Sequence, residues 1–172
     1  MSILETYYHP GQGGRDSEGD RNVRGLARMV QVSPSTTIVD LTLRGIAPGT
    51  YRATIREYGD LNDGVSSAGP VWGGENEEGN RRGQLGTITI GKDGRGSAFL
   101  DSPFKVWEVI GHALAVSKQD ETNGAPLTND YDTVVGVIAR SAGVWDNDKT
   151  VCSCTGKTLW EERKEEVRKG ML

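Results

Sequence analysis

Histidine is scarce in this sequence, and its scarcity excludes a whole class of metal site. Only two histidines occur among the 172 residues, His9 and His112. A metal centre built from several imidazoles therefore cannot be assembled within the chain. His9 stands in a Gly/Pro-rich stretch and is expected in a loop. His112 is expected to be partly buried and hydrogen-bonded.

Three other absences narrow the class of protein further. The longest apolar runs fall far short of the ~20 residues that span a bilayer, and the first residues do not follow the pattern of a secretory signal. At a net charge of −4 the sequence also has no basic stripe for phosphate backbones. We therefore expect a protein of a reducing compartment, with no membrane span and no nucleic-acid partner.

Glycine, in contrast, is abundant at 24 residues, and it separates short segments that alternate between apolar and polar side chains. The strand-like segments are residues 37–44, 51–56, 87–90, 97–100, 106–116 and 133–139. The first, with Val39, Leu41 and Leu43 on one face, is predicted to pair with the second, and the third with the fourth as a hairpin. This pattern predicts an all-β Greek-key sandwich or barrel.

The chain after residue 145 differs in composition from the part before it. It is polar, contains both cysteines of the sequence, and ends in a capping box, Thr158 with Glu161, that predicts a helix over residues 159–169. We therefore predict a β domain over residues 1–145 and a separate tail over residues 146–172.

Cys152 and Cys154 are the candidate metal-binding and reactive residues of the tail. Two thiolates one residue apart are soft ligands that favour Cu(I), and they are too few for a closed zinc site. The same spacing allows a strained disulfide that exchanges readily with other thiols. Spacing alone leaves an inert pair as the alternative, so the flanking residues have to decide.

Those flanking residues resemble a known family. The segments Gly136–Trp145 and Cys152–Arg163 resemble the C-terminal part of copper chaperones for superoxide dismutase. Upstream, the segments Glu57–Asp60, Ser67–Pro70 and Leu85–Gly86 resemble copper/zinc superoxide dismutase itself. The resemblance implies a dismutase-like, eight-stranded Greek-key barrel followed by an extended and helical Cys-X-Cys tail. The family's N-terminal copper-capturing domain has no counterpart here, and a trimmed chain and a naturally short form are both open.

The sequence departs from the dismutase at every metal-binding position that the resemblance identifies. Those positions carry Thr54, Arg56, Val71, Arg81, Gln84 and Ser117. The two cysteines of the dismutase's intrasubunit disulfide correspond to Val65 and Val135. We therefore expect no dismutase activity, no zinc in the barrel, and a barrel held by packing without that crosslink.

The resemblance implies a copper metallochaperone that forms a heterodimer with copper/zinc superoxide dismutase. It would deliver Cu(I) from Cys152 and Cys154 and promote the target's disulfide by thiol exchange, with the attacking cysteine and the resting state of the pair left open. The implied interface residues are Gly59, Ile110, Gly111, Val137, Ile138 and Arg140. Arg140 stands where the dismutase has an apolar interface residue, which would disfavour self-pairing.

Several alternatives stay open at this point. Core packing is the alternative for the apolar interface residues, Val137 above all, and the free protein could be a monomer or a homodimer. The rival functions are a working dismutase and a binding module whose cysteines are incidental. The expected compartment is the cytoplasm, with the mitochondrial intermembrane space as a second candidate.

Overall fold

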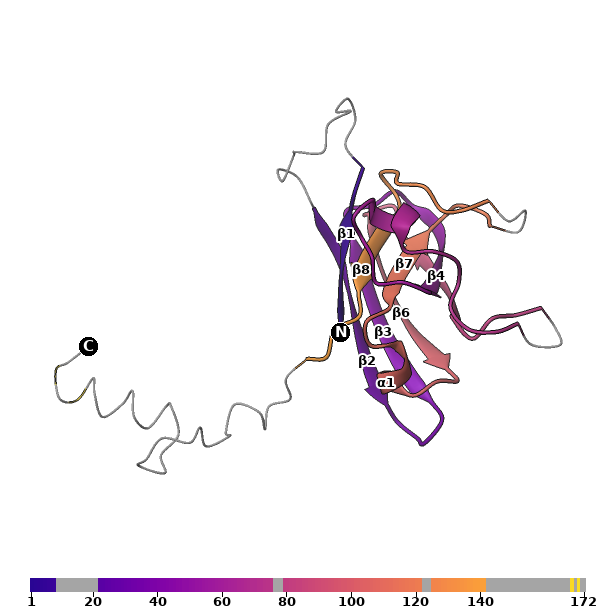
Figure 1. Cartoon of the computed structure of the whole chain (residues 1–172). Helices are drawn as coiled ribbons and strands as arrows, with labels where there is room; N and C mark the ends of the chain where they lie inside the picture. Colours follow the sequence, from indigo (N-terminus) through magenta and orange to yellow (C-terminus); the bar gives the residue numbers. More distant parts are fainter. Residues whose placement is uncertain (9–21, 76–78, 122–124, 142–167, 169, 171–172) are drawn as a thin grey trace. The chain divides into compact units, whose positions relative to one another are not determined.

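The computed structural model describes residues 1–8, 22–75, 79–121, 125–141, 168 and 170. The chain divides into two compact units, residues 1–139 and 140–172, and the fold below is that of the first unit (Figure 1). Most of the second unit lies outside the described residues. The tail over residues 146–172, its helix and a boundary after residue 145 therefore stay predictions.

The first unit is an antiparallel β-barrel, as predicted. Its described residues form the strands β1 (Ser2–Thr6), β2 (Val23–Gln31), β3 (Thr37–Arg44), β4 (Gly49–Arg56), β5 (Gln84–Ile90), β6 (Arg95–Ser102), β7 (Ala113–Ser117) and β8 (Val134–Val137). The order across the sheet is β5-β4-β7-β8-β1-β2-β3-β6. The first and last strands of this order also contact each other. The sheet is thus rolled into a nearly closed barrel (Figure 1).

Two short helical segments lie in the connections between strands. The 3₁₀ segment η1 (Gly64–Ser67) follows β4, and the single turn α1 (Val106–Val109) follows β6. Among the described residues, no helix has the length and apolar character needed to cross a membrane.

Alternation of apolar side chains explains the inner face of the barrel. In β3, the side chains of Val39, Leu41 and Leu43 are all buried, as the sequence pattern predicted. In β4, Tyr51 and Ile55 point into the same core. Because successive side chains of a strand face opposite sides, burying every second residue fixes which face of each strand forms the core.

The predicted pairing of residues 37–44 with 51–56 is wrong. β3 pairs with β2 and β6, and β4 pairs with β5 and β7. The connection between them turns away from a hairpin at Gly45, whose φ is 70° and whose N–H donates to the carbonyl of Gly94 at 2.8 Å. That bond ties the connection to the turn between β5 and β6, so the chain crosses the end of the barrel.

The predicted hairpin over residues 87–90 and 97–100 is correct only at its turn. The N–H of Gly91 donates to the carbonyl of Arg95 at 3.0 Å. Beyond that turn, β5 forms its ladder with β4 and β6 forms its ladder with β3. Within the described strands there is no ladder between β5 and β6.

The strand predicted over residues 106–116 is correct only from Ala113 onward. Before it, α1 forms because a carboxylate oxygen of Glu108 accepts the N–H of Lys105 at 2.7 Å and caps the turn. Gly111, with a φ of 89°, then reverses the chain into β7. A local capping bond therefore outweighs the strand-like composition of this segment.

The buried apolar residues form two groups, one inside the barrel and one outside it. The barrel core includes Leu4, Leu41 and Leu114. The outer cluster lies between the barrel wall and its covering loops and consists of Val65, Ala68, Ala113, Ala115, Leu127 and Val135. β7 is buried at all five of its residues because each of its faces contributes to a different group.

Candidate functional site

Four of the six predicted interface residues lie together on the barrel. An ideal Cβ placed on Gly59 would lie 2.1 Å from the carbonyl oxygen of Gly111 and 3.6 Å from a methyl group of Val137. Gly59 therefore packs its bare backbone against these two residues. Ile110 precedes Gly111 in the same turn, and the side chains of Ile110 and Val137 are 40% and 38% exposed. We call Gly59, Ile110, Gly111 and Val137 the candidate patch.

Ile138 supports the candidate patch from beneath. Its side chain is 1% exposed and belongs to the barrel core. Its backbone fixes the turn of the patch, because its carbonyl accepts the N–H of Gly111 at 2.9 Å and its N–H donates to the carbonyl of His112 at 2.8 Å. Core packing was the alternative considered above all for Val137. It is Ile138 whose side chain lies in the core, whereas that of Val137 is partly exposed.

Arg140, the sixth predicted residue, is exposed. It belongs to the second compact unit. Its part in an interface stays a prediction.

Ile3 extends the apolar surface beside the patch and was missed in the sequence. The pairings of Glu5 with Val135 and of Ser2 with Ile138 set a register that places Ile3 opposite Val137. Its side chain is 50% exposed. The sequence did hold a signal for it. Ile3 and Leu4 are adjacent apolar residues, and because neighbouring side chains of a strand point to opposite faces, only one of the two can face the core.

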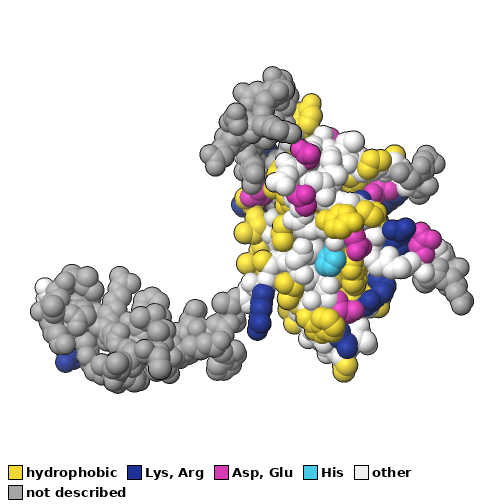
Figure 2. Space-filling model, in the orientation of Figure 1, with side chains coloured by type: hydrophobic (Ala, Val, Ile, Leu, Met, Phe, Trp, Pro, Cys, Tyr) yellow, Lys and Arg dark blue, Asp and Glu magenta, His cyan; other side chains and the backbone are white. Residues whose placement is uncertain are grey.

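One face of the molecule is shown in Figure 2. Apolar side chains form several small groups there, with charged and polar groups between them.

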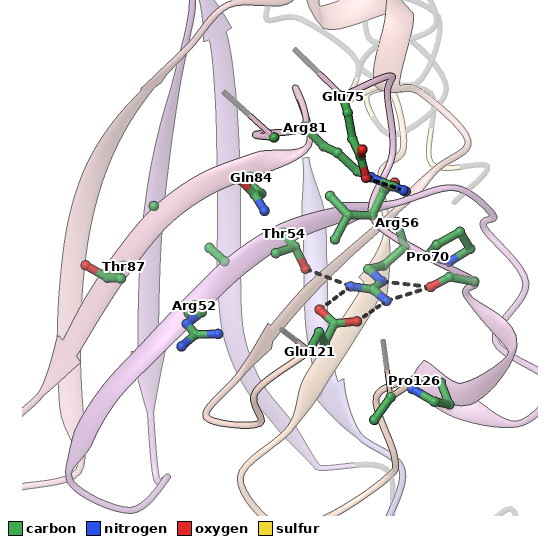
Figure 3. A pocket seen from close by; sticks show the side chains of 16 residues that line it. Arg52, Thr54, Arg56, Pro70, Glu75, Arg81, Gln84, Thr87, Glu121 and Pro126 are labelled. Carbon is green, nitrogen blue, oxygen red and sulfur yellow. Dashed lines mark hydrogen bonds and ion pairs between the residues drawn. The ribbon is translucent and has the colours of Figure 1, made fainter. Parts of the chain in front are cut away.

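A pocket opens elsewhere on the barrel, where the resemblance places the dismutase's metals. It has a volume of about 880 Å³, and its lining includes Thr54, Arg56, Val71, Arg81 and Gln84 (Figure 3). These are five of the six residues that replace metal ligands. The sixth, Ser117, shares a hydrogen bond of 2.8 Å with the hydroxyl of Thr133.

Arg56 dominates this pocket. Its side chain is 1% exposed, and Nη1 and Nη2 donate to the two carboxylate oxygens of Glu121 at 2.9 and 2.7 Å. Nε and Nη2 also donate to the carbonyl oxygen of Gly69 at 3.0 and 2.7 Å, and Nη1 donates to the hydroxyl of Thr54 at 3.3 Å. Figure 3 shows these bonds converging on the guanidinium.

The other arginines of the pocket are paired as well. Arg81 lies 3.0 Å from a carboxylate oxygen of Glu75 and donates to the carbonyl of Val71 at 3.1 Å. Arg52 lies 2.9 Å from a carboxylate oxygen of Asp120. Among the described residues, each arginine that lines the pocket thus has a carboxylate partner.

The residues of this pocket do not fit a copper/zinc pair. Such a site needs imidazole and carboxylate ligands free to coordinate, whereas Arg56 brings a permanent cation to the position of a ligand. Within the described part of the chain, no group of three or more His, Cys, Asp or Glu residues could hold a metal ion.

His112 is partly buried and hydrogen-bonded, as predicted. Its Nδ1 donates to the carbonyl oxygen of Arg56 at 3.1 Å, and its ring lies 5.6 Å from that of Trp72. The histidine therefore joins the turn of the candidate patch to the end of β4.

The two positions that correspond to the dismutase's disulfide are occupied by apolar packing. Val65 of η1 and Val135 of β8 both belong to the outer cluster. Van der Waals contact thus holds the loop against the barrel at the place where the resemblance puts the dismutase's disulfide.

The predicted copper-binding residues, Cys152 and Cys154, lie outside the described residues. Their roles in binding copper and in thiol exchange therefore stay predictions.

Comparison with known proteins confirms the resemblance. Residues 23–138 match the family of copper/zinc superoxide dismutase (SODC). The chain is 42% identical over 170 residues to the superoxide dismutase 1 copper chaperone of Saccharomyces cerevisiae, covering 96% of this chain and 65% of that protein. It is 34% identical over 161 residues to the copper chaperone for superoxide dismutase of Homo sapiens, covering 84% of this chain and 59% of that protein. The chain thus spans 59 to 65% of the length of these relatives.

Proposed function

The chain belongs to the copper/zinc superoxide dismutase family, and from this premise we propose that it is a copper metallochaperone for such a dismutase and not a dismutase itself. The observation that carries the proposal is the buried Arg56–Glu121 ion pair at the position of a copper ligand. A barrel that keeps the dismutase fold but places an arginine at the metal site has lost metal binding there. It would keep the outer surface through which the enzyme forms its dimer. Relatives named as copper chaperones for superoxide dismutase support the same role.

The barrel would recognise its target by imitating it. Symmetric homodimers use one self-complementary surface on both subunits, so a protein with the same surface can replace one subunit. The candidate patch offers such a surface, with two half-exposed apolar side chains beside two glycines. Arg140 would bias the choice toward a heterodimer by placing a charge where self-association buries an apolar residue.

Cu(I) would be the cargo of this protein. Cys152 and Cys154 would hold it as thiolates and pass it to the target's vacant imidazole site, since soft sulfur ligands prefer Cu(I). A site with two ligands has room for an incoming third ligand, which favours transfer over storage.

In a separate round, a chain whose Cys152 and Cys154 already form a disulfide would oxidise the target by thiol exchange. A target thiolate attacks the Cys152–Cys154 disulfide and forms a mixed disulfide, and the target's second thiolate then displaces the chaperone sulfur. One disulfide is broken in this chain and one is formed in the target, so two electrons pass to the chaperone. A reducing compartment such as the cytoplasm, or the mitochondrial intermembrane space, would supply the reduced target.

The test adds two forms of this protein, one loaded with Cu(I) and one with Cys152 and Cys154 joined as a disulfide, to metal-free, disulfide-reduced copper/zinc superoxide dismutase. We expect dismutase activity and the target's disulfide to appear together. The variant Cys152→Ser/Cys154→Ser keeps the described barrel and should bind the target without activating it.

Two outcomes would favour the rival functions. Full activation by the double serine variant would leave a binding module with incidental cysteines. Dismutase activity of the purified chain alone, persisting in the double serine variant, would indicate a working dismutase.

A further inference from the structure

We propose that Arg56 is a positioning residue for target recognition, one that fixes both segments of the candidate patch without metal or disulfide. This inference rests on the proposed function, since it concerns the surface that would bind the dismutase. One segment carries Gly59, and the other carries Gly111.

The side chain of Arg56 holds the first segment through Gly69. Nε and Nη2 both donate to the carbonyl oxygen of Gly69, at 3.0 and 2.7 Å. A guanidinium has five N–H groups, and the contacts to Gly69, Thr54 and Glu121 provide five hydrogen bonds for them. The planar group is therefore locked in one orientation, and the Gly69 carbonyl is locked with it.

From Gly69 the constraint passes to the residues beside Gly59. The N–H of Glu57 donates to the carbonyl of Pro70 at 2.9 Å, and the N–H of Tyr58 donates to the carbonyl of Ala68 at 2.9 Å. Gly69 has a φ of 76°, and the ring of Tyr58 fills the space where its Cβ would stand. The segment around Gly69 thus forms a support on which residues 57–58 rest.

The backbone of Arg56 holds the second segment through His112. The carbonyl oxygen of Arg56 accepts the Nδ1–H of His112 at 3.1 Å. His112 follows Gly111 directly, and its carbonyl accepts the N–H of Ile138. One residue therefore connects to both halves of the patch, by its side chain on one side and its carbonyl on the other.

Glu121 offsets the free-energy cost of burying the Arg56 guanidinium. A guanidinium buried without a partner is strongly unfavourable, and removing one partner of a buried ion pair leaves that penalty uncompensated. The Glu121 side chain is 26% exposed, and it comes from the loop after β7, 65 residues along the chain from Arg56. The pair thus ties a third segment to the same point.

The experiment measures two quantities on the full chain. One is the affinity for metal-free, disulfide-reduced copper/zinc superoxide dismutase, and the other is the hydrogen exchange of the Tyr58 backbone N–H. The variants are Arg56→Leu, Arg56→Lys and Glu121→Gln. Leu41→Ala in the barrel core serves as the matched control, because it destabilises the fold at a residue outside the patch and its supports. All measurements are made where urea titration shows each variant to be folded.

We expect Arg56→Leu to expose the Tyr58 N–H to exchange and to weaken target binding. If only a tenth of the molecules keep the competent arrangement, the apparent affinity falls about tenfold. Arg56→Lys keeps the charge but offers three N–H donors in place of five, so it should give an intermediate loss, as should Glu121→Gln. Leu41→Ala should bind within about twofold of the wild type, despite its lower stability.

Two results would overturn the inference. A folded Arg56→Leu variant with wild-type affinity and a protected Tyr58 N–H would show that Arg56 positions nothing. Equal losses of affinity in Arg56→Leu and Leu41→Ala would show a role in stability alone. A wild-type chain that fails to bind the target would instead overturn the proposed function, and the exchange of Tyr58 would then decide on its own whether Arg56 holds the loop.

Discussion

The two apolar groups of this protein, the barrel core and the outer cluster, lie on opposite sides of the same strands and are built differently. On the inner side of β7, Leu114 and Val116 meet long aliphatic side chains from the other strands. On the outer side, Ala113 and Ala115 belong, among the described residues, to a smaller cluster that joins Val135 of β8 to residues of the covering loops. The inner group therefore contains more buried residues, and more long aliphatic ones, than the outer cluster.

This difference separates the stability of the fold from the shape of its surface. The barrel core can hold the sheet together whatever the loops do. The outer cluster holds the loop from residue 57 to residue 70 with little apolar area, and it is helped by polar contacts such as the 2.9 Å hydrogen bond from the N–H of Val65 to the side-chain oxygen of Asn129. Recognition of the target dismutase would then depend on the outer cluster, the smaller of the two apolar groups.

The largest effect on stability is expected from Leu41→Ala in the barrel core. Removal of a fully buried leucine side chain should lower the free energy of unfolding by about 2–5 kcal/mol, through lost burial and the cavity that remains. Urea unfolding measures this loss. Retained affinity for the dismutase would support the separation between core and surface, and a parallel loss of affinity would contradict it.

Gly59→Ala should act in the opposite way, with a smaller effect on stability and a larger one on binding. The new Cβ would lie 2.1 Å from the carbonyl oxygen of Gly111, a distance at which the backbone has to move. Such overpacking typically lowers the free energy of unfolding by about 1–3 kcal/mol. The expected result is loss of target binding in a chain that still unfolds cooperatively. Gly74→Ala provides the matched control, because a Cβ there would meet nothing within 4 Å.

Val65→Ala tests the outer cluster directly. The loss of two buried methyl groups should lower the free energy of unfolding by about 1.6 kcal/mol. Because Val65 anchors the loop that carries Gly59, we also expect a modest loss of target affinity, measured by calorimetry. Unchanged affinity would mean that polar contacts alone position the loop.

The smallest effect is expected at Glu108, which caps α1 beside the barrel core. The N–H of Lys105, and then Arg82, hold the pKa of Glu108 below its usual 4.5. A carboxyl with a lowered pKa in the folded state contributes stability above its unfolded pKa, and this contribution is lost as the pH falls through the folded value. Glu108→Gln should therefore slightly flatten the loss of stability that occurs as the pH falls below about 4.5. An unchanged profile would show that the cap contributes nothing.

Strands such as β3 and β4 could be predicted from alternation, but their pairing could not. The inner faces of β3 and β4 follow directly from the sequence, since both strands cover the core on one face only. Their partners depend on a turn that crosses the barrel, and that turn is fixed by a bond between Gly45 and Gly94, far apart in the chain.

The candidate patch was predicted from resemblance, and the choice between Val137 and Ile138 shows the limit of that approach. The run from Val134 to Ile138 is apolar throughout, because β8 contributes to the barrel core on one face and to the outer cluster on the other. Alternation gives no signal in such a strand. The network of Arg56 was equally out of reach, because its partner Glu121 lies in a separate loop that only the folded chain brings close.

The missing ladder between β5 and β6 has a consequence for partly unfolded forms of the protein. Local unfolding starts where the fewest hydrogen bonds must break, and here that place is the boundary between these two strands. β8 and β1 stand in the middle of the strand order, at the greatest distance from both. A molecule opened at this boundary would keep the strands beneath the candidate patch paired. It would also expose two free strand edges, which makes aggregation the expected fate of the opened form when no partner is bound.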